Sequence, residues 1–137
     1  ILGALGRLKK PNLKRKIRHR AVSVVHALGG RLPNLVEVLD LAVDARNFFV
    51  HGSKTKFVSD DALHSNMHFL TEALEFVFAL SDLHEANWPI ANLTRNGTIQ
   101  SHPFGSFLAG YDGELTELKK GLPSNHHLNQ STAPAPT

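Results

Sequence analysis

Hydrophobic residues recur at helical spacing in four stretches of the chain, each bounded by polar or helix-breaking residues. The pattern predicts helices over about 12–28, 35–50, 60–87 and 106–121. The segment 90–105, before the last helix, is expected to be irregular, and Gly110 and Gly113 make that helix the weakest of the four. The expected fold class is all-α, an up-and-down bundle of about four helices.

Polar caps and glycine or proline breaks set the expected helix ends. Asn12 and Ser59 are candidate N-caps for the first and third helices. The break from Gly29 to Pro33 is short enough to make the first two helices antiparallel neighbours. Trp88, followed by a proline, ends the third helix and is expected to fill the end of the bundle.

Three regions are expected along the chain. Residues 1–11 form a leading segment, residues 12–122 a helical domain, and residues 123–137 a disordered tail without apolar periodicity. Because the chain opens on Ile1 rather than Met, we expect the leading segment to continue a longer chain; a trimmed sequence is the alternative.

The helix expected at 35–50 carries one charge that its pattern does not explain. Its polar residues form one narrow stripe on a helical projection: Glu37, Asp40, Asp44, Asn47 and His51. Arg46 projects instead from the middle of the apolar arc, where an unpaired buried guanidinium is costly.

Two explanations of Arg46 stay open at this point. In the first, Arg46 pairs with a carboxylate of another helix, and Gly52 merely ends its own helix in the left-handed conformation. In the second, Arg46 and His51 face a shared cleft at a subunit interface, where Arg46 holds a phosphate and His51 transfers a proton. The helix dipole at the C-terminal turn favours the imidazolium form of His51, which suits a general acid.

The motif resembles a known family. An Arg, a polar residue directly after it and a His four to six residues beyond, as in Arg46-Asn47-Phe48-Phe49-Val50-His51, is similar to the signature of HEPN domains. The flanking Ala42–Gly52, then Leu74–Phe78 and Ser101–Gly105, resemble the Apea-like HEPN group in order and spacing. The resemblance covers about residues 12–122.

The resemblance implies a helical bundle that dimerises and brings two copies of the motif together. It implies a metal-independent endoribonuclease without a cofactor, in which the 2′-OH of RNA attacks and leaves a cyclic phosphate and a 5′-OH. Arg46 would stabilise the phosphorane charge, His51 would act as acid or base, and Asn47 would orient His51 or bond the phosphate. The biological role implied is phage defence by abortive infection, or a toxin paired with an antitoxin, in the cytoplasm.

A non-catalytic module is the alternative that the resemblance also allows. Such a domain would bind RNA or a nucleotide and dimerise, or serve as a sensor for an attached effector. An additional N-terminal domain would then be a further partner.

Charge is strongly polarised along the chain. Up to Arg31 there are nine basic residues and no acid, or +9, whereas the remainder carries six basic and twelve acidic residues, or −6. We expect RNA phosphates to be bound by the basic segment and by the loop after His51. The residues are Lys14, Arg15, Arg18, Lys54 and Lys56. The alternative is a solvated basic face that docks on the acidic remainder of the same fold.

Composition excludes several classes of protein. There is no cysteine, so disulfides and thiolate metal sites are excluded, and no apolar run is long enough to cross a bilayer. His64 and His68 stand four residues apart, a spacing that can ligate zinc, but no third ligand is evident and no metal is expected. His102 is expected either to approach the Arg46 and His51 cleft as an accessory group or to belong to a segment that caps the bundle.

Overall fold

Four α-helices and one short 3-10 helix make up the described part of the chain. The computed structural model describes residues 12–94, 103–126 and 128. The elements follow one another as α2 (Leu13–Ala27), α3 (Leu35–His51), α4 (Asp60–Glu85), η1 (Ile90–Thr94) and α5 (Pro103–Lys120). The expected all-α bundle is confirmed, and no described residue lies in a strand.

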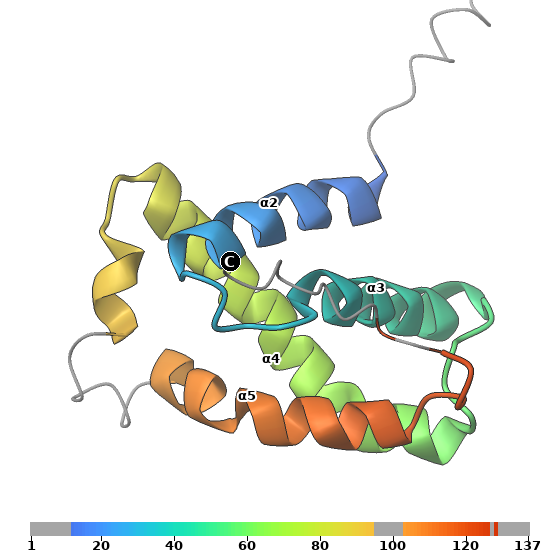
Figure 1. Cartoon of the computed structure of the whole chain (residues 1–137). Coiled ribbons are helices and arrows are strands. Elements are labelled where there is room, and N and C mark those ends of the chain that lie inside the picture. The colour runs from blue at the N-terminus through green and yellow to red at the C-terminus, as the bar shows by residue number, and fades with distance from the viewer. Residues whose placement is uncertain (1–11, 95–102, 127, 129–137) are drawn as a thin grey trace, which may run out of the picture.

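The helix α4 is the central element of the bundle. It packs against α2, α3 and α5, and α2 and α3 also pack on each other. Figure 1 shows α4 crossing the molecule diagonally, with α5 along one side and α2 and α3 along the other. The end of α3 lies beside the start of α4, because only a short loop joins the two helices.

The core joins aliphatic residues of α2, α3 and α4 to an aromatic layer between α4 and α5. In that layer the rings of Phe76 and Phe107 lie 4.5 Å apart between centroids, and those of Phe69 and Tyr111 lie 5.7 Å apart. Each buried aromatic ring removes a large apolar area from water. The layer therefore holds α5 on the bundle although that helix contains two glycines.

Three predicted helix ends are confirmed. The side chain of Asn12 accepts a hydrogen bond of 2.9 Å from the backbone N–H of Arg15, and Ser59 accepts one of 3.1 Å from Ala62. Gly52 ends α3 in the left-handed conformation, with φ of 67°. That conformation favours a residue without a Cβ, so the glycine fixes the end of the helix directly after His51.

Three further expectations are corrected. Helix α5 begins at Pro103 rather than at Ser106, because proline suits a first helical turn, where its missing N–H would have no partner. Trp88 is 43% exposed and does not fill the bundle end; Ile90, at 2% exposure, is buried there instead. Of the predicted tail, Leu128 is buried against the core rather than disordered.

Candidate active site at the end of α3

The expectation that Arg46 is buried is wrong. Its side chain is exposed, and its guanidinium makes one hydrogen bond, 3.3 Å long, to the side-chain oxygen of the neighbouring Asn47. Helical periodicity placed Arg46 on the apolar arc, but in the last turns of α3 the neighbouring helices cover only part of that arc. Ala45 is buried there, whereas Arg46 and Val50 are exposed. The first explanation therefore does not apply, because no carboxylate among the described residues receives the guanidinium. The second explanation, a cleft at a subunit interface, stays a prediction.

His51 is the last residue of α3 and is also exposed. The backbone N–H groups of Gly52 and Ser53 bond to the carbonyls of Phe48 and Asn47, at 2.9 Å and 3.5 Å, so the turn that carries His51 is fixed at its C-terminal side. Arg46 and His51 are five residues apart, which places them about 140° apart around the helix. One protomer thus presents the two groups on different flanks of α3.

Apolar side chains surround Arg46 on the surface. Phe49 and Val50 are 50% and 57% exposed, and they lie about 60° and 40° from Arg46 around the helix. The ring of Phe49 meets that of His64 on α4 edge to face, with centroids 5.6 Å apart. We call Arg46, Phe49, Val50 and His64 the motif face. It combines a cation with exposed apolar area, a composition typical of interfaces between proteins.

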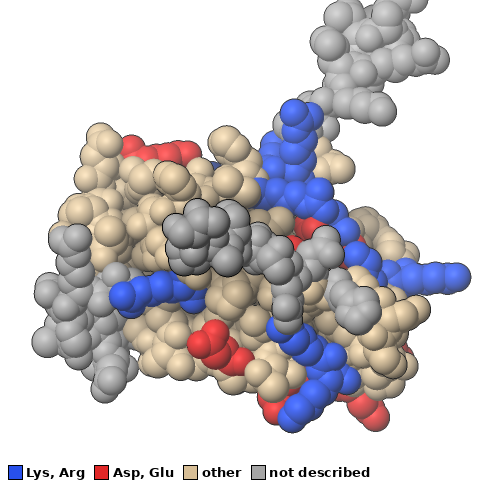
Figure 2. All heavy atoms as spheres, in the orientation of Figure 1, with Lys and Arg blue, Asp and Glu red and all other residues tan. Residues whose placement is uncertain are grey.

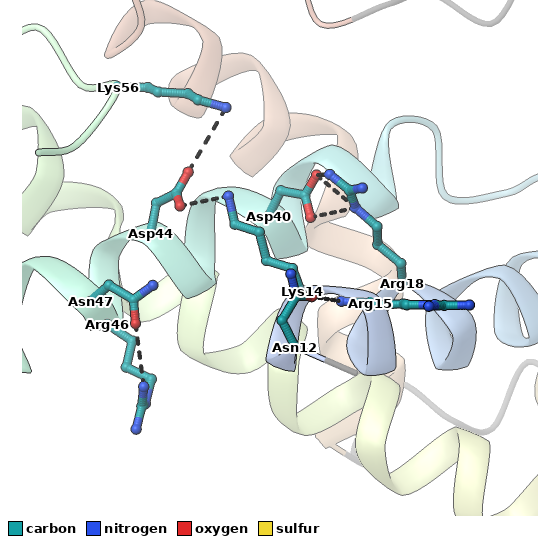
Figure 3. Close-up of polar contacts among 9 residues, drawn as sticks. All are labelled: Asn12, Lys14, Arg15, Arg18, Asp40, Asp44, Arg46, Asn47 and Lys56. Atoms are coloured by element: carbon teal, nitrogen blue, oxygen red, sulfur yellow. Dashed lines mark hydrogen bonds and ion pairs between the residues drawn. The ribbon is translucent and has the colours of Figure 1, made fainter. Parts of the chain in front are cut away.

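The polar stripe of α3 faces α2 and pairs with its cations. Asp40 accepts hydrogen bonds from Arg18 at 2.9 Å on Nε and 2.5 Å on Nη2, and Asp44 forms an ion pair of 2.6 Å with Lys14. The hydrogen bond and the negative charge of Asp40 raise the pKa of Arg18. Two cations four residues apart thus meet two carboxylates four residues apart, as two antiparallel helices require (Figure 3).

The loop after α3 joins the same network. Lys56 reaches Asp44 from the loop at 3.8 Å, so this carboxylate lies between cations of α2 and of the loop. Figure 3 shows Arg46 pointing away from these pairs, on the other side of α3. The loop itself is held by Phe57, which is buried, and by a hydrogen bond of 3.0 Å from the N–H of Val58 to the carbonyl of Gly121.

The predicted RNA-binding residues therefore fall into two groups. Lys14, Arg18 and Lys56 have carboxylate partners, whereas no described carboxylate lies within ion-pair distance of Arg15 or Lys54. Figure 2 shows basic side chains gathered over the first half of α2, with acidic atoms beside them. The alternative that the basic face docks on the acidic remainder applies to the first group.

Sequence analysis missed the role of Asp40 and Asp44. Both were assigned to a polar stripe, and the signal that could have found their partners was their spacing, which matches that of Lys14 and Arg18 with opposite sign. His102 lies outside the described residues. Within the described ranges no group of three or more His, Asp or Glu side chains is arranged to hold a metal ion. No described helix is long and apolar enough to cross a membrane.

Comparison with known proteins identifies the family. No curated protein and no solved structure matches the chain significantly. A family model described as Apea-like HEPN matches residues 1–90, which include α2, α3, α4 and the whole Arg46–His51 motif. That match spans well over half of the chain. The protein is therefore a member of the Apea-like HEPN family.

Proposed function

We propose that the protein is a metal-independent endoribonuclease whose active site forms where two α3 ends meet in a homodimer. The observation that carries the proposal is the motif face: Arg46 stands exposed among Phe49 and Val50 on the helix that ends in His51. Exposed apolar residues around a cation are costly to leave in water in a monomer, and pairing two such faces removes that cost. HEPN domains typically dimerise, which agrees with this arrangement.

The protein needs only to align the 2′-OH with the scissile phosphate, to neutralise the phosphate charge and to exchange protons. RNA carries its nucleophile in the 2′-OH, so a scissile phosphate needs a cation on its non-bridging oxygens and groups that exchange protons. Arg46 supplies the cation, with a planar guanidinium that can bond two phosphate oxygens. His51 protonates the leaving 5′ oxygen. Asn47 holds the guanidinium of Arg46 in place through its side-chain oxygen.

RNA would reach this site along the basic side of the molecule. Arg15 and Lys54 offer charges without a described carboxylate partner, whereas Lys14, Arg18 and Lys56 must exchange a carboxylate for a phosphate. We place the biological role, within the same proposal, in phage defence by abortive infection or in a toxin system, with an antitoxin as partner in the second case.

A non-catalytic dimerisation or RNA-binding module is the second candidate. The observation that favours it is the wide separation of Arg46 and His51 around α3, which leaves each protomer without a complete site. In such a module the motif face would still pair, but no bond in RNA would break.

Incubation of the purified protein with total RNA in EDTA separates the two candidates. The enzyme is expected to produce fragments with a 2′,3′-cyclic phosphate and a 5′-OH, and Arg46→Ala and His51→Ala should each abolish them. The matched controls are Arg31→Ala, an exposed arginine after α2, and His26→Ala, an exposed histidine in the last turn of α2. RNA binding without cleavage, unchanged in all four variants, would support the module and refute the nuclease.

A further inference from the structure

Cleavage by 2′-OH attack moves two protons, and the motif of one protomer supplies one imidazole, that of His51. One group must take the 2′-OH proton as the new O–P bond forms, and another must give a proton to the 5′ oxygen as the P–O bond breaks. We give His51, the last residue of α3, the second task. In a dimer the first task falls either to the second copy of His51 or to another imidazole beside the motif.

His64 lies beside the motif on the neighbouring helix. Its ring is in edge-to-face contact with Phe49, at 5.6 Å between centroids. Phe49 follows Arg46 by three residues, and side chains three apart on a helix are neighbours. His64 is thus one side chain away from the guanidinium, and it is exposed on the same face.

The hydrogen bonding of His64 presents one ring nitrogen in a defined state. Nδ1 lies 2.7 Å from the backbone carbonyl of Asp60, and since a carbonyl only accepts, Nδ1 donates its hydrogen there. In the neutral ring the proton is therefore on Nδ1, and Nε2 carries a lone pair. A fixed ring with a free Nε2 lone pair is the form that a general base requires.

His68, one turn further along α4, provides a contrast. Its Nε2 lies 3.3 Å from a carboxylate oxygen of Glu72, so the same nitrogen is already engaged. It has no ring contact with α3 among the described residues. The two exposed histidines thus differ at Nε2, which contacts a carboxylate in His68 and carries an available lone pair in His64.

We propose that His64 is the general base of this nuclease and acts together with His51 of the partner subunit. The inference rests on the proposed endoribonuclease function. Nε2 of His64 takes the proton of the 2′-OH, whose oxygen bonds to phosphorus, and His51 of the partner subunit gives its proton to the departing 5′ oxygen. Cyclic phosphate and 5′-OH result, and the two imidazoles have exchanged protonation states, to be restored by water.

The shared site follows from the positions of these residues around α3. Phe49 and His51 are two residues apart, or about 160° around the helix, so His64 on Phe49 and His51 of the same protomer lie on opposite sides. One phosphate cannot contact both. Where two α3 ends meet about a twofold axis, the second copy offers the other imidazole.

Mixing two inactive variants tests the shared site directly. His64→Ala and His51→Ala are each expected to lose at least about 100-fold in cleavage rate. After co-refolding, random pairing gives mixed dimers in which one site holds both imidazoles, so the mixture should recover about a quarter of the wild-type rate. His64→Phe, which keeps a ring against Phe49, should behave as His64→Ala, and His68→Ala should retain full activity.

A substrate with sulfur in place of the scissile 5′ oxygen assigns the base and the acid. Sulfur leaves without protonation, so this substrate should restore cleavage by His51→Ala but not by His64→Ala. Wild-type activity with an equally active His64→Ala, no recovery on mixing, or rescue of His64→Ala by sulfur would each overturn this inference and leave the proposed function standing. Failure of the wild-type protein to cleave any RNA would overturn both.

Discussion

At the scale of single residues, Tyr111 connects the last helix to the start of α3. Its hydroxyl donates a hydrogen bond of 2.6 Å to the carbonyl of Pro33, and its ring belongs to the aromatic layer. Burial, and then the negative charges of Glu37 and Asp112, raise the pKa of Tyr111. The hydroxyl therefore stays protonated, and able to donate, up to a higher pH in the folded chain than in the unfolded chain.

Replacing Tyr111 by Phe should lower the free energy of unfolding by about 1 kcal/mol, because the carbonyl of Pro33 loses its partner. The unfolded chain releases its tyrosine proton near pH 10, before the folded chain does, so the contribution of Tyr111 is complete below about pH 10 and declines above it. Urea unfolding of the wild type and of Tyr111→Phe, at pH 7 and at about pH 10.5 to 11, measures the difference between their free energies of unfolding. A difference in free energy of unfolding that grows as the pH rises would contradict this prediction.

Asp44 forms ion pairs with Lys14 and Lys56, so we expect it to limit the affinity for RNA. Asp44→Asn should tighten RNA binding several-fold at low salt and should make it more salt-dependent, by about 0.7 in the log–log slope per added phosphate contact. Fluorescence anisotropy with a short labelled RNA measures both. Glu114→Gln, which removes an exposed carboxylate of α5, is the control of equal charge. Equal affinity for the two variants would show that Asp44 does not restrain the lysines.

Arg46 shows that the exposure of a side chain could not be predicted from helical periodicity. Its angular position on α3 followed from helical geometry, and the motif it belongs to was visible in the sequence. Its exposure could not be seen in the sequence. Periodicity gives the direction of a side chain around the helix, but not which part of the helix the neighbouring elements cover. Phe49 and Val50, counted among the apolar positions, are exposed for the same reason.

At the scale of elements, local signals determined most of the fold. Asn12 and Ser59 cap α2 and α4, and Gly52 ends α3, all through contacts within a few residues in sequence. Local sequence signals predicted helix boundaries least well where tertiary packing determines them. Helix α5 continues through Gly110 and Gly113 because its buried aromatic residues fix it on α4, and nothing in its own sequence required that.

Replacing glycine by alanine should have opposite effects within α5 and directly after it. A Cβ at Gly110 or Gly113 would meet nothing within 4 Å, so alanine there should raise the free energy of unfolding by about 0.5–1 kcal/mol each. A Cβ at Gly121 would lie 3.2 Å from the Asn66 amide nitrogen and 3.3 Å from the Phe57 ring, both buried, so Gly121→Ala should be destabilising. Thermal unfolding of the three variants checks the order; a stabilising Gly121→Ala would contradict the packing described.

At the scale of the whole molecule, opposite charges from distant parts of the sequence lie together. The basic segment up to Arg31 and the acidic remainder meet in ion pairs. These join Lys14, Arg18 and Arg20 to Asp44, Asp40 and Asp82. Because these pairs are partly exposed, each contributes little to stability, and we expect their main effect to be on where anions can bind. Arg46 of the motif face points away from the pairs of Lys14 and Arg18, on the other side of α3 (Figure 3).

The motif face is expected to hold two copies together. Val50→Asp should shift the protein from dimer to monomer, because it buries a charge at the centre of the pairing. Val22→Asp changes a valine of the same exposure, 57%, on α2 and should leave the dimer intact. Sedimentation velocity of the two variants is decisive. Equal sedimentation of both variants and the wild type would place any interface elsewhere.

The cleavage rate per protomer, measured over a range of protein concentration in EDTA, tests most directly whether the active site needs two α3 ends. The rate per protomer should fall in proportion to the dimer fraction as the protein is diluted, and Val50→Asp should be inactive at every concentration where it is monomeric. A rate per protomer that stays constant while sedimentation shows monomers would contradict the account.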